Sequence, residues 1–516
     1  MAKTKSAVCA RGGNWFLAAR VRTASLALAV LVLSTAACTS GGESVFGPSA
    51  SSSAPAPAGN GSGVSLGRGS QEGGIPVQVG CTAGTGAACV PVCSGGATTT
   101  YEGTVYDPAD ANPLYNVAVY IPNSPLPDPL PAGAQCGCSG FFPQTILTSA
   151  VTDENGHFVL QGVPTGKGLP LVVQAGKWRK LYQVDIDVPC QPNVAADRSL
   201  RLPRSASEGS LPDIAISTGG ADSLECLLLR IGVDASEYVA GAGSGGHIHI
   251  FAGFAGATTA AGAPASNEAL WDSEADLMAN DVVLLSCEGQ ETANVTAASQ
   301  EALLDYASQG GRAFASHYHY VWFDQGPFDT YRLAQWMTGP QIVVPDDNAA
   351  VPGNVVTTLA NGQGFPEGAA LQGWLANVGA LTQGSLPIWY ARDNVVLLNQ
   401  PPSVPWIQLD PSVAQAPGAI QYFSLDAPIG YSLQCGRVVY SDLHVSGGPG
   451  SDEPGVPPDY PDAGLIGTNR KGGIVPSGCA AHPLTPQEEA LEFMLFDLSS
   501  CLVPIGQGPS PVPIAQ

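Results

Sequence analysis

Hydrophobic and polar positions alternate along several segments between residues 98 and 203, and this period of two predicts β-strands. Residues 152–160 predict a hairpin, because Asn155-Gly156 supplies the positive φ angles of a tight turn. The other expected strands cover residues 100–106, 117–121, 169–174 and 182–188. We expect these strands to form a small β-sandwich over residues 79–204.

From residue 205 onward the pattern changes to apolar strands that alternate with amphipathic helices. One helix is expected over 222–231, with Asp222 as its N-cap and leucines at helical spacing behind it. A second is expected over 297–309, and a last one follows the capping box that begins at Thr485. Strands are expected at 212–217, 247–251, 281–286 and 436–444. This alternation predicts a mostly parallel sheet with helices on both faces, over residues 205–502.

A further strand follows the glycine pair Gly310-Gly311 and ends in Ser316-His317-Tyr318-His319. Ligands of open α/β sheets bind outside the carboxyl ends of the strands, so this end is the expected functional site. Right-handed crossovers make parallel strands point the same way, and the ends at 217–218, 286–288 and 441–442 are therefore expected at the same edge. His317, His319 and His444 could share a divalent metal there. The alternative is that each histidine satisfies its own local hydrogen bond.

Acid–base chemistry is a second possibility for this edge. The candidate catalytic residues are His317, Glu288 and Asp442, because imidazoles transfer protons near neutral pH and carboxylates orient them. His247 and His249 could form another metal pair, although the polar face of an edge strand is the commoner arrangement. The strand before Gly219-Gly220 lacks both GxGxxG and GK[ST], so nucleotide binding is not expected.

The strand segments of the first half carry a family resemblance. EGTVYDP, PLYNVAVYIP, TDENGHFVLQGVP and LPLVVQAG, in this order, resemble the carboxypeptidase regulatory-like (transthyretin-like) domain. The resemblance covers roughly a hundred residues and is interrupted by a Pro- and Cys-rich insertion at 123–144. It implies a prealbumin-like sandwich that serves as a spacer, a stabiliser or a binding module without catalysis.

The second half carries another resemblance, over roughly residues 211–500. DVVLLS, LLDYASQGGRAFASHYH and GRVVYSDLH are similar to the trehalose-utilisation (ThuA-like) branch of the class I glutamine amidotransferase-like fold. The resemblance implies a flavodoxin-like α/β domain. Amidotransferases carry their nucleophilic cysteine after the glycine pair, where this chain has Ser316-His317, so glutaminase chemistry is not expected. Cys287 lies one strand earlier and does not match that position. Between 323 and 433 only a short helix near 369–375 can be placed.

The N-terminus has the pattern of an export signal over residues 1–37, with basic residues followed by the apolar run 24–33. Small residues lead to Cys38, which resembles the lipidated cysteine of a bacterial lipobox and implies anchoring to a membrane. An ordinary signal peptidase cut before Cys38 is the alternative. Residues 38–78 are rich in Ser, Gly, Ala and Pro and predict a flexible tether, and 503–516 a disordered tail.

Charge and cysteine content narrow the picture further. The 516-residue chain has a net charge of −23, and such an acidic surface would repel nucleic acid. Of its 13 cysteines, 11 lie beyond Cys38. Exported cysteines usually pair, which predicts five disulfides and one free thiol. Cys136-Gly-Cys138 is too tightly spaced for a zinc knuckle, so disulfides are expected there instead.

Two functions compete on these grounds. In the first, a cell-envelope lipoprotein displays the sandwich and the ThuA-like domain to bind carbohydrate, another small polar ligand or a surface partner. In the second, the α/β domain is an extracytoplasmic, metal-dependent enzyme that acts on a carbohydrate-related substrate through the region of His317, His319 and His444. The absence of an identifiable nucleophile–base pair favours binding. We also expect residues from about 205 onward to fold independently.

Overall fold

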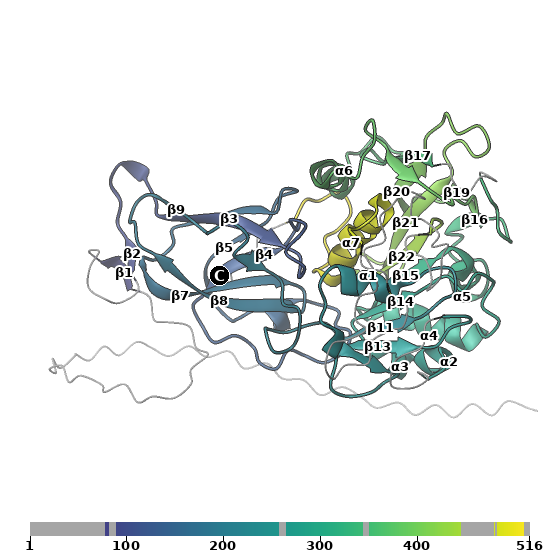
Figure 1. Ribbon diagram of the computed structural model, residues 1–516, viewed down its shortest axis with the longest axis horizontal. Coiled ribbons are helices and arrows are strands. Elements are labelled where there is room, and N and C mark those ends of the chain that lie inside the picture. Colours follow the sequence, from purple (N-terminus) through teal and green to yellow (C-terminus); the bar gives the residue numbers. More distant parts are fainter. Residues whose placement is uncertain are drawn as a thin grey trace, which may run out of the picture. The chain divides into compact units, whose positions relative to one another are not determined.

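A computed structural model describes residues 78–81, 89–256, 265–343, 350–444, 479 and 482–509 (Figure 1). The chain divides into two compact units, Met1–Gly69 and Ser70–Gln516, and all described residues belong to the second. The predicted export signal, Cys38 and the tether up to residue 77 lie outside the described residues. Among the described residues, no helix has the length and apolar character needed to cross a membrane.

The first half of the described chain forms the predicted β-sandwich. One sheet has the order β5 (Ile146–Val151), β4 (Ala118–Pro122), β7 (Gly166–Ala175), β8 (Trp178–Ile186). The other has the order β10 (Leu200–Arg201), β3 (Thr100–Tyr106), β6 (His157–Gln161), and β9 (Pro192–Val194) also pairs with β3. Alternate residues of β3, including Tyr101 and Val105, are buried between the sheets, as the alternating pattern predicts. Strands β1 (Gln78–Cys81) and β2 (Cys89–Pro91) form a separate parallel pair.

The predicted hairpin over 152–160 is wrong in its pairing. Strand β5 pairs with β4, whereas β6 pairs with β3 in the other sheet, so the connection crosses between the two layers. Gly156 has a φ of 69°, but Asn155 is not among the residues with positive φ. Instead, the Asp153 carboxylate accepts hydrogen bonds from the backbone N–H groups of Asn155 and His157, both at 2.9 Å. A side-chain-supported turn of this type does not need the paired positive φ angles of a two-residue hairpin.

The second half is built on a mixed sheet, which in the described chain has ten strands. Its parallel half has the order β12 (Tyr238–Ala240), β13 (Ile248–Phe251), β11 (Ile214–Ser217), β14 (Val282–Leu285), β15 (Arg312–Ser316), β22 (Gly436–Ser441). The antiparallel half continues with β21 (Ile420–Ala427), β20 (Val404–Leu409), β17 (Val351–Val355), β18 (Leu386–Ile388). Strands β16 (Ala334–Trp336) and β19 (Val395–Leu398) pair separately. The parallel strands were expected, and the antiparallel half arises from the segment in which only one helix could be placed.

Helices cover both faces of this sheet. On one face lie α1 (Leu224–Arg230), α6 (Pro366–Val378) and α7 (Pro486–Ser499). On the other lie α2 (Glu268–Trp271), α3 (Glu274–Met278), α4 (Ala297–Ser308) and α5 (Gly326–Asp329), as Figure 1 shows. The two cores are separated by strand residues that point alternately to either side, because Ile214 and Ile216 join the α1–α7 side and Ala215 joins the α4 side. Short 3₁₀ segments are η1 (Ser94–Gly96), η2 (Ser139–Phe141), η3 (Ala235–Glu237) and η4 (His317–Trp322).

Helix α7 packs against both the sheet and the sandwich. It begins with the predicted capping box of Thr485 and Glu488 and is buried on nearly every side. Phe493 stacks on Tyr115 of the sandwich with ring centroids 5.5 Å apart, and Phe496 meets Trp178 edge-on at 5.9 Å. A helix that is buried on nearly every side lies inside a core, and α7 also buries the polar side chains of Gln487, Glu488 and Glu492 there. One hydrophobic core therefore runs from the sandwich to the sheet.

Disulfides connect the same two parts of the chain, and the prediction of disulfides is confirmed. Cys89 is disulfide-bonded, whereas Cys287 is a free buried thiol. The pairs between described cysteines are Cys93–Cys190, Cys136–Cys435, Cys138–Cys501 and Cys226–Cys479. The second and third pairs join the sandwich insertion to the residue before β22 and to the end of α7. The shared core and these bonds argue against independent folding from residue 205. Disulfides in this number are typical of an oxidising compartment.

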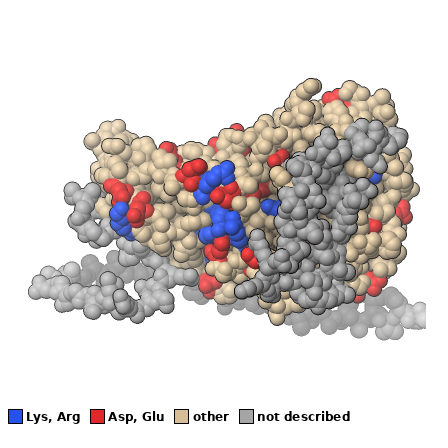
Figure 2. All heavy atoms as spheres, in the orientation of Figure 1, with Lys and Arg blue, Asp and Glu red and all other residues tan. Residues whose placement is uncertain are grey.

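Charged side chains are sparse on the face drawn in Figure 2, and most of the basic ones lie next to acidic ones. Ion pairs of the sandwich join such charges, since Lys180 and Arg201 both contact Glu208, and Lys167 contacts Asp185 and Asp187. Exposed pairs of this kind contribute little to stability. Most of that face is therefore neutral, so direct contacts there would be made mainly through apolar and uncharged polar groups.

Candidate functional site

The carboxyl ends of the central parallel strands meet at one edge of the sheet, as expected. In register, Ser217 pairs with Leu285, Leu285 with Ala315, and Ser316 with Ser441. After β11 the chain forms β12 and β13 on one side of β11, and it then crosses to form β14 on the other side. Such a reversal of strand order creates a crevice outside the strand ends, where α/β proteins bind their ligands.

His317 occupies a strained position directly after β15. It is buried and has a φ of 39°, which non-glycine residues seldom adopt. Tyr440 holds this conformation by donating a hydrogen bond from its hydroxyl to the His317 carbonyl at 2.8 Å. The bend directs the imidazole toward β14, and its Nδ1 atom lies 3.6 Å from Sγ of Cys287.

His444 completes a cluster of three ligand-type side chains. Its ring centroid lies 4.9 Å from that of His317, with the rings nearly perpendicular. Cys287, His317 and His444 each present one ligand atom, and these atoms lie within 4.8 Å of one another. All three residues are buried. The cluster joins the ends of three parallel strands that are far apart in the sequence.

The carboxylate of Asp222 contacts His444 of this cluster directly and Cys287 through Ser316. Its Oδ1 lies 3.2 Å from Nδ1 of His444, and its Oδ2 accepts a hydrogen bond from the Ser316 hydroxyl at 2.7 Å. The same hydroxyl accepts the backbone N–H of Cys287 at 2.8 Å. The prediction that Asp222 caps a helix is wrong, because Ser223 is the N-cap of α1 and the Asp222 side chain is used in the site instead.

Burial sets the charge states of Cys287 and His317. Burial, and then the nearby Asp222 carboxylate, raises the pKa of the Cys287 thiol. Burial, and then His444, lowers the pKa of His317 well below its ordinary value, so its imidazole is neutral. Nε2 of His317 has no hydrogen-bond partner among the described residues, although Asn394 and the carbonyl of Pro340 are its polar neighbours. The cluster thus contains a thiol and a neutral imidazole in contact.

His319, the third metal ligand expected from the sequence, lies outside the cluster. Its Nδ1 accepts the indole N–H of Trp322 at 3.1 Å, and its Nε2 therefore donates to the Ser286 carbonyl at 2.9 Å. Burial lowers its pKa to about 4, which keeps the ring neutral. Both ring nitrogens are satisfied locally, as the alternative for these histidines proposed.

Glu288 and Asp442 were expected as catalytic partners of His317. Instead, both carboxyl groups accept hydrogen bonds from asparagine residues. Glu288 accepts a hydrogen bond from the Asn267 amide at 2.7 Å, and burial raises its pKa. Asp442 accepts the N–H of Asn394 at 2.5 Å, and burial raises its pKa to about 8. Neither belongs to the three-residue cluster. Asp442 positions the loop that brings Asn394 next to His317.

Other histidines have their own partners, and two residues of the site were missed. His247 contacts Glu237 at 2.7 Å, and His249 contacts the Gly241 carbonyl at 3.1 Å, which does not suggest a shared metal. From the sequence, Cys287 had no role in the site, and Asp222 was assigned only to the cap of a helix. Both follow the carboxyl end of a central strand, and that position was the signal that could have identified them.

No family model matches this chain, and no curated protein matches it either. Two solved structures are similar to part of it, and both are chains of type II cohesin–X-dockerin complexes from Acetivibrio cellulolyticus. The complex with a C-terminal interface mutant is 15% identical, covers 24% of this chain and 78% of its own, and has a TM-score of 0.14. The complex with an N-terminal interface mutant is 14% identical, covers 29% and 88%, and has a TM-score of 0.16. Scores of this size do not establish a shared fold.

Proposed function

We propose that this protein is an exported, envelope-anchored protein whose α/β domain binds a transition metal, with zinc favoured, and holds a small polar ligand beside it. The observation that carries the proposal is the convergence of Cys287, His317 and His444 within 4.8 Å at the carboxyl edge of the sheet. One thiolate and two imidazoles are a donor set that zinc accepts.

The distance between two of the three ligand atoms suits such an ion. Zinc binds sulfur at about 2.3 Å and imidazole nitrogen at about 2.0–2.1 Å, so a tetrahedral angle separates the two ligand atoms by about 3.6 Å. Sγ of Cys287 and Nδ1 of His317 are 3.6 Å apart. Because Nδ1 of His444 faces Asp222, its Nε2 is the atom left for the metal. A carboxylate behind a ligating histidine fixes the ring and raises its basicity.

Three protein ligands leave a fourth position on a tetrahedral metal. In catalytic zinc sites this position holds water or substrate, whereas structural sites are closed by four protein ligands. A metal bound here would act as a Lewis acid toward a hydroxyl or carbonyl group. This arrangement is compatible with either of the functions expected from the sequence, ligand binding or metal-dependent catalysis on a carbohydrate-related substrate.

A thiol–imidazole nucleophile is the competing use of Cys287 and His317. The raised pKa of the thiol and the Asp222 carboxylate near it oppose thiolate formation without a cation. Metal binding removes that obstacle, since a coordinating thiol loses its proton to the solvent. We therefore favour a metal ligand over a nucleophile.

Two further parts of the proposal come from resemblance. The parallel half of the sheet, with helices on both faces, supports a flavodoxin-like, ThuA-like assignment, and the sandwich supports a carboxypeptidase regulatory-like one. The disulfides support an extracytoplasmic location, with lipidation at Cys38 as the proposed anchor. Carbohydrate is the proposed ligand class.

Metal content tests the central claim. Full-length protein loaded with zinc and dialysed should retain one zinc per chain by mass spectrometry of the metal. Cys287→Ser and His444→Ala should lose it, whereas the control His249→Gln should keep it. A protein that retains no zinc, or variants that retain it fully, would remove the metal centre. Glycan binding by a zinc-free protein would then favour a simple binding module.

A further inference from the structure

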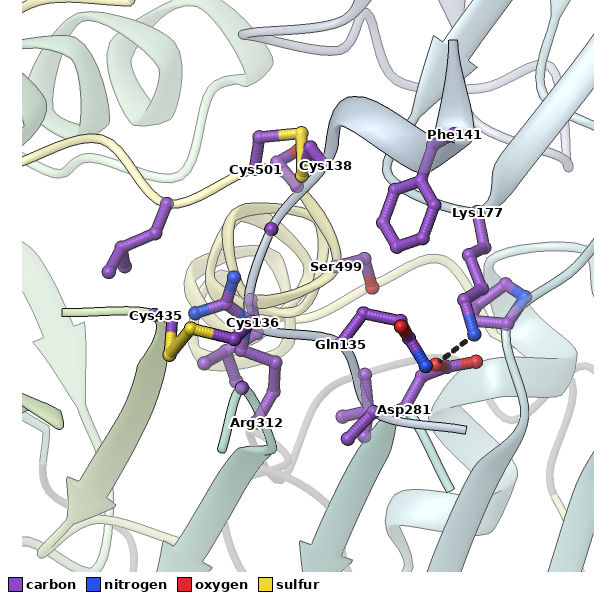
Figure 3. A pocket seen from close by; sticks show the side chains of 18 of the residues that line it. Gln135, Cys136, Cys138, Phe141, Lys177, Asp281, Arg312, Cys435, Ser499 and Cys501 are labelled. Atoms are coloured by element: carbon purple, nitrogen blue, oxygen red, sulfur yellow. Dashed lines mark ion pairs between the residues drawn. A yellow bond between two sulfur atoms is a disulfide. The ribbon is translucent and has the colours of Figure 1, made fainter. Parts of the chain in front are cut away.

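A separate cavity of about 160 Å³ lies at the opposite, amino-terminal edge of the sheet (Figure 3). Its floor includes Val282 and Arg312, the first residues of β14 and β15. Its walls come from the sandwich insertion around Cys136 and from the end of α7 around Ser499. It is therefore distinct from the cluster of Cys287, His317 and His444, which lies beyond the carboxyl ends of the same strands.

Arg312 is a buried cation whose Nη1 atom has no hydrogen-bond partner among the described residues. It is 9% exposed, and its guanidinium makes no hydrogen bond or ion pair with any residue that the structure describes. Asp426 and Asp497, the nearby acids, are both bound by Arg437 at 2.8 Å. Burial, and then the like charge of Arg437, lowers the pKa of Arg312 to about 10, so it remains charged at neutral pH. A buried charge without a counter-ion is unfavourable.

Lys177, the second basic residue of the cavity, has a counter-ion. Lys177 forms an ion pair with Asp281 at 2.5 Å and donates to the Gly133 carbonyl at 2.8 Å. The dashed line in Figure 3 marks this ion pair. These three, Arg312, Lys177 and Asp281, are the charged residues that line the cavity. Because Asp281 neutralises Lys177, the cavity lining carries one net positive charge, that of Arg312.

We propose that this cavity binds a small oxyanion, a carboxylate or phosphate group, on the guanidinium of Arg312. The planar fork of guanidinium matches two oxygens of either group. A water molecule occupies about 30 Å³ of liquid, so the cavity can hold such a group together with a few waters. The anion supplies the counter-charge that the described chain does not.

The walls make the site preformed. The disulfides Cys136–Cys435 and Cys138–Cys501 both line the cavity and join the insertion to the sheet and to α7 (Figure 3). An anion bound there contacts the junction between the sandwich and the α/β domain. Because it binds the folded chain and not the unfolded one, it should raise the unfolding temperature with concentration.

Thermal unfolding of the full chain tests the site, with sodium phosphate, sodium acetate and sodium chloride at matched ionic strength. We expect a saturable rise in unfolding temperature with phosphate, acetate or both, but not with chloride, confirmed by calorimetric titration. A rise with phosphate alone assigns the site to phosphate groups, and one with acetate alone assigns it to carboxylates. No rise with either anion overturns the proposal.

Variants of Arg312 make the test specific. Arg312→Gln should weaken binding at least about tenfold, the factor expected from the loss of hydrogen bonds to a charged group. The control Lys167→Gln, at an exposed ion pair of the sandwich, should bind as tightly as the wild type. In anion-free buffer Arg312→Met should unfold at the wild-type temperature or above, because it removes an unpaired buried charge. Undiminished anion binding by Arg312→Gln, or a large loss of anion-free stability in Arg312→Met, would contradict the assignment.

Discussion

Nδ1 of His444 lies 3.2 Å from Oδ1 of Asp222, although the two residues are 222 positions apart in the sequence. The same carboxylate reaches Ser316, whose hydroxyl holds the backbone of Cys287. One buried acid therefore orients two of the three residues that form the proposed metal centre.

Replacing this acid should weaken the metal centre without removing a ligand. Asp222→Asn keeps the shape of the side chain but loses its charge, and we expect zinc affinity to fall about 10–100-fold. The measurement is competition against a chromophoric chelator. Asp272→Asn, at an exposed position of the same domain, is the matched control. Equal affinities for Asp222→Asn and the wild type would show that Asp222 does not act through His444.

His319 should matter for stability and not for metal content. His319→Leu leaves the Ser286 carbonyl and the Trp322 indole N–H without partners, and we expect a loss of about 3 kcal/mol in unfolding free energy. Zinc stoichiometry should stay at one per chain in those molecules that remain folded. Urea unfolding and metal analysis measure the two quantities. His157→Leu, on the sandwich, should change stability by less than about 0.5 kcal/mol. Loss of zinc from folded His319→Leu would restore His319 as a ligand.

Stability should fall as the pH rises, through a buried pair of acids between the sandwich and α7. Burial raises the pKa of Asp107 from 3.8 to about 7 and raises that of Glu492 as well, and Asn112 donates to Glu492 at 2.7 Å. The folded state therefore holds a proton more tightly than the unfolded state. Its stabilisation is complete below about pH 4 and is lost as the pH rises through about 7.

The check is a comparison of unfolding free energies between pH 4 and pH 8. Wild type should lose a few kcal/mol more than Asp107→Asn over this range, since the amide cannot titrate. Asp153→Asn, in an exposed turn of the sandwich, serves as the control. Parallel pH profiles for wild type and Asp107→Asn would rule out the raised pKa of Asp107 in the folded state.

A fragment that begins at residue 205 should not fold on its own. It would expose Phe493 and Phe496 of α7, which pack on Tyr115 and Trp178 of the sandwich. It would also lack the partners of Cys435 and Cys501. We expect rapid proteolysis and no cooperative unfolding by circular dichroism, whereas a chain from residue 70 should unfold cooperatively. A soluble, cooperative fragment would restore the expectation of two independent domains.

Anchoring can be tested at Cys38, which lies outside the described residues. We expect Cys38→Ala to move the protein from the membrane fraction to the soluble fraction after cell breakage, because lipidation requires that thiol. Cys9→Ala, earlier in the same segment, should leave the protein in the membrane fraction. Membrane retention of Cys38→Ala would contradict the lipoprotein proposal.

The sequence predicted the elements whose pattern is local. Strand β3 alternates in burial along its length, and α7 carries its own capping box, so both could be identified from neighbouring residues. The antiparallel half of the sheet lacks such signals. Strand β21 is buried at every position, and proline interrupts β17, β18 and β20, so neither alternation nor uninterrupted β-propensity marks them.

The errors at the site have a similar cause. The prediction placed both His317 and His319 at the end of the strand and grouped them as ligands of one metal. The chain instead enters η4, where residues three apart share a face, and His319 meets Trp322. Cys287 could not be paired with His317 from spacing alone, because their contact depends on the register between β14 and β15.

The position of α7 also dictates when this protein can fold. The helix that completes the common core of sandwich and sheet begins only at residue 486. The disulfide of Cys138 cannot form before Cys501 has been synthesised. If the chain is exported as proposed, it lacks these partners while it is being synthesised and passed across a membrane. Contacts of such long range form slowly. The chain should thus stay unfolded, and competent for threading through a translocon, until its last helix has arrived on the far side.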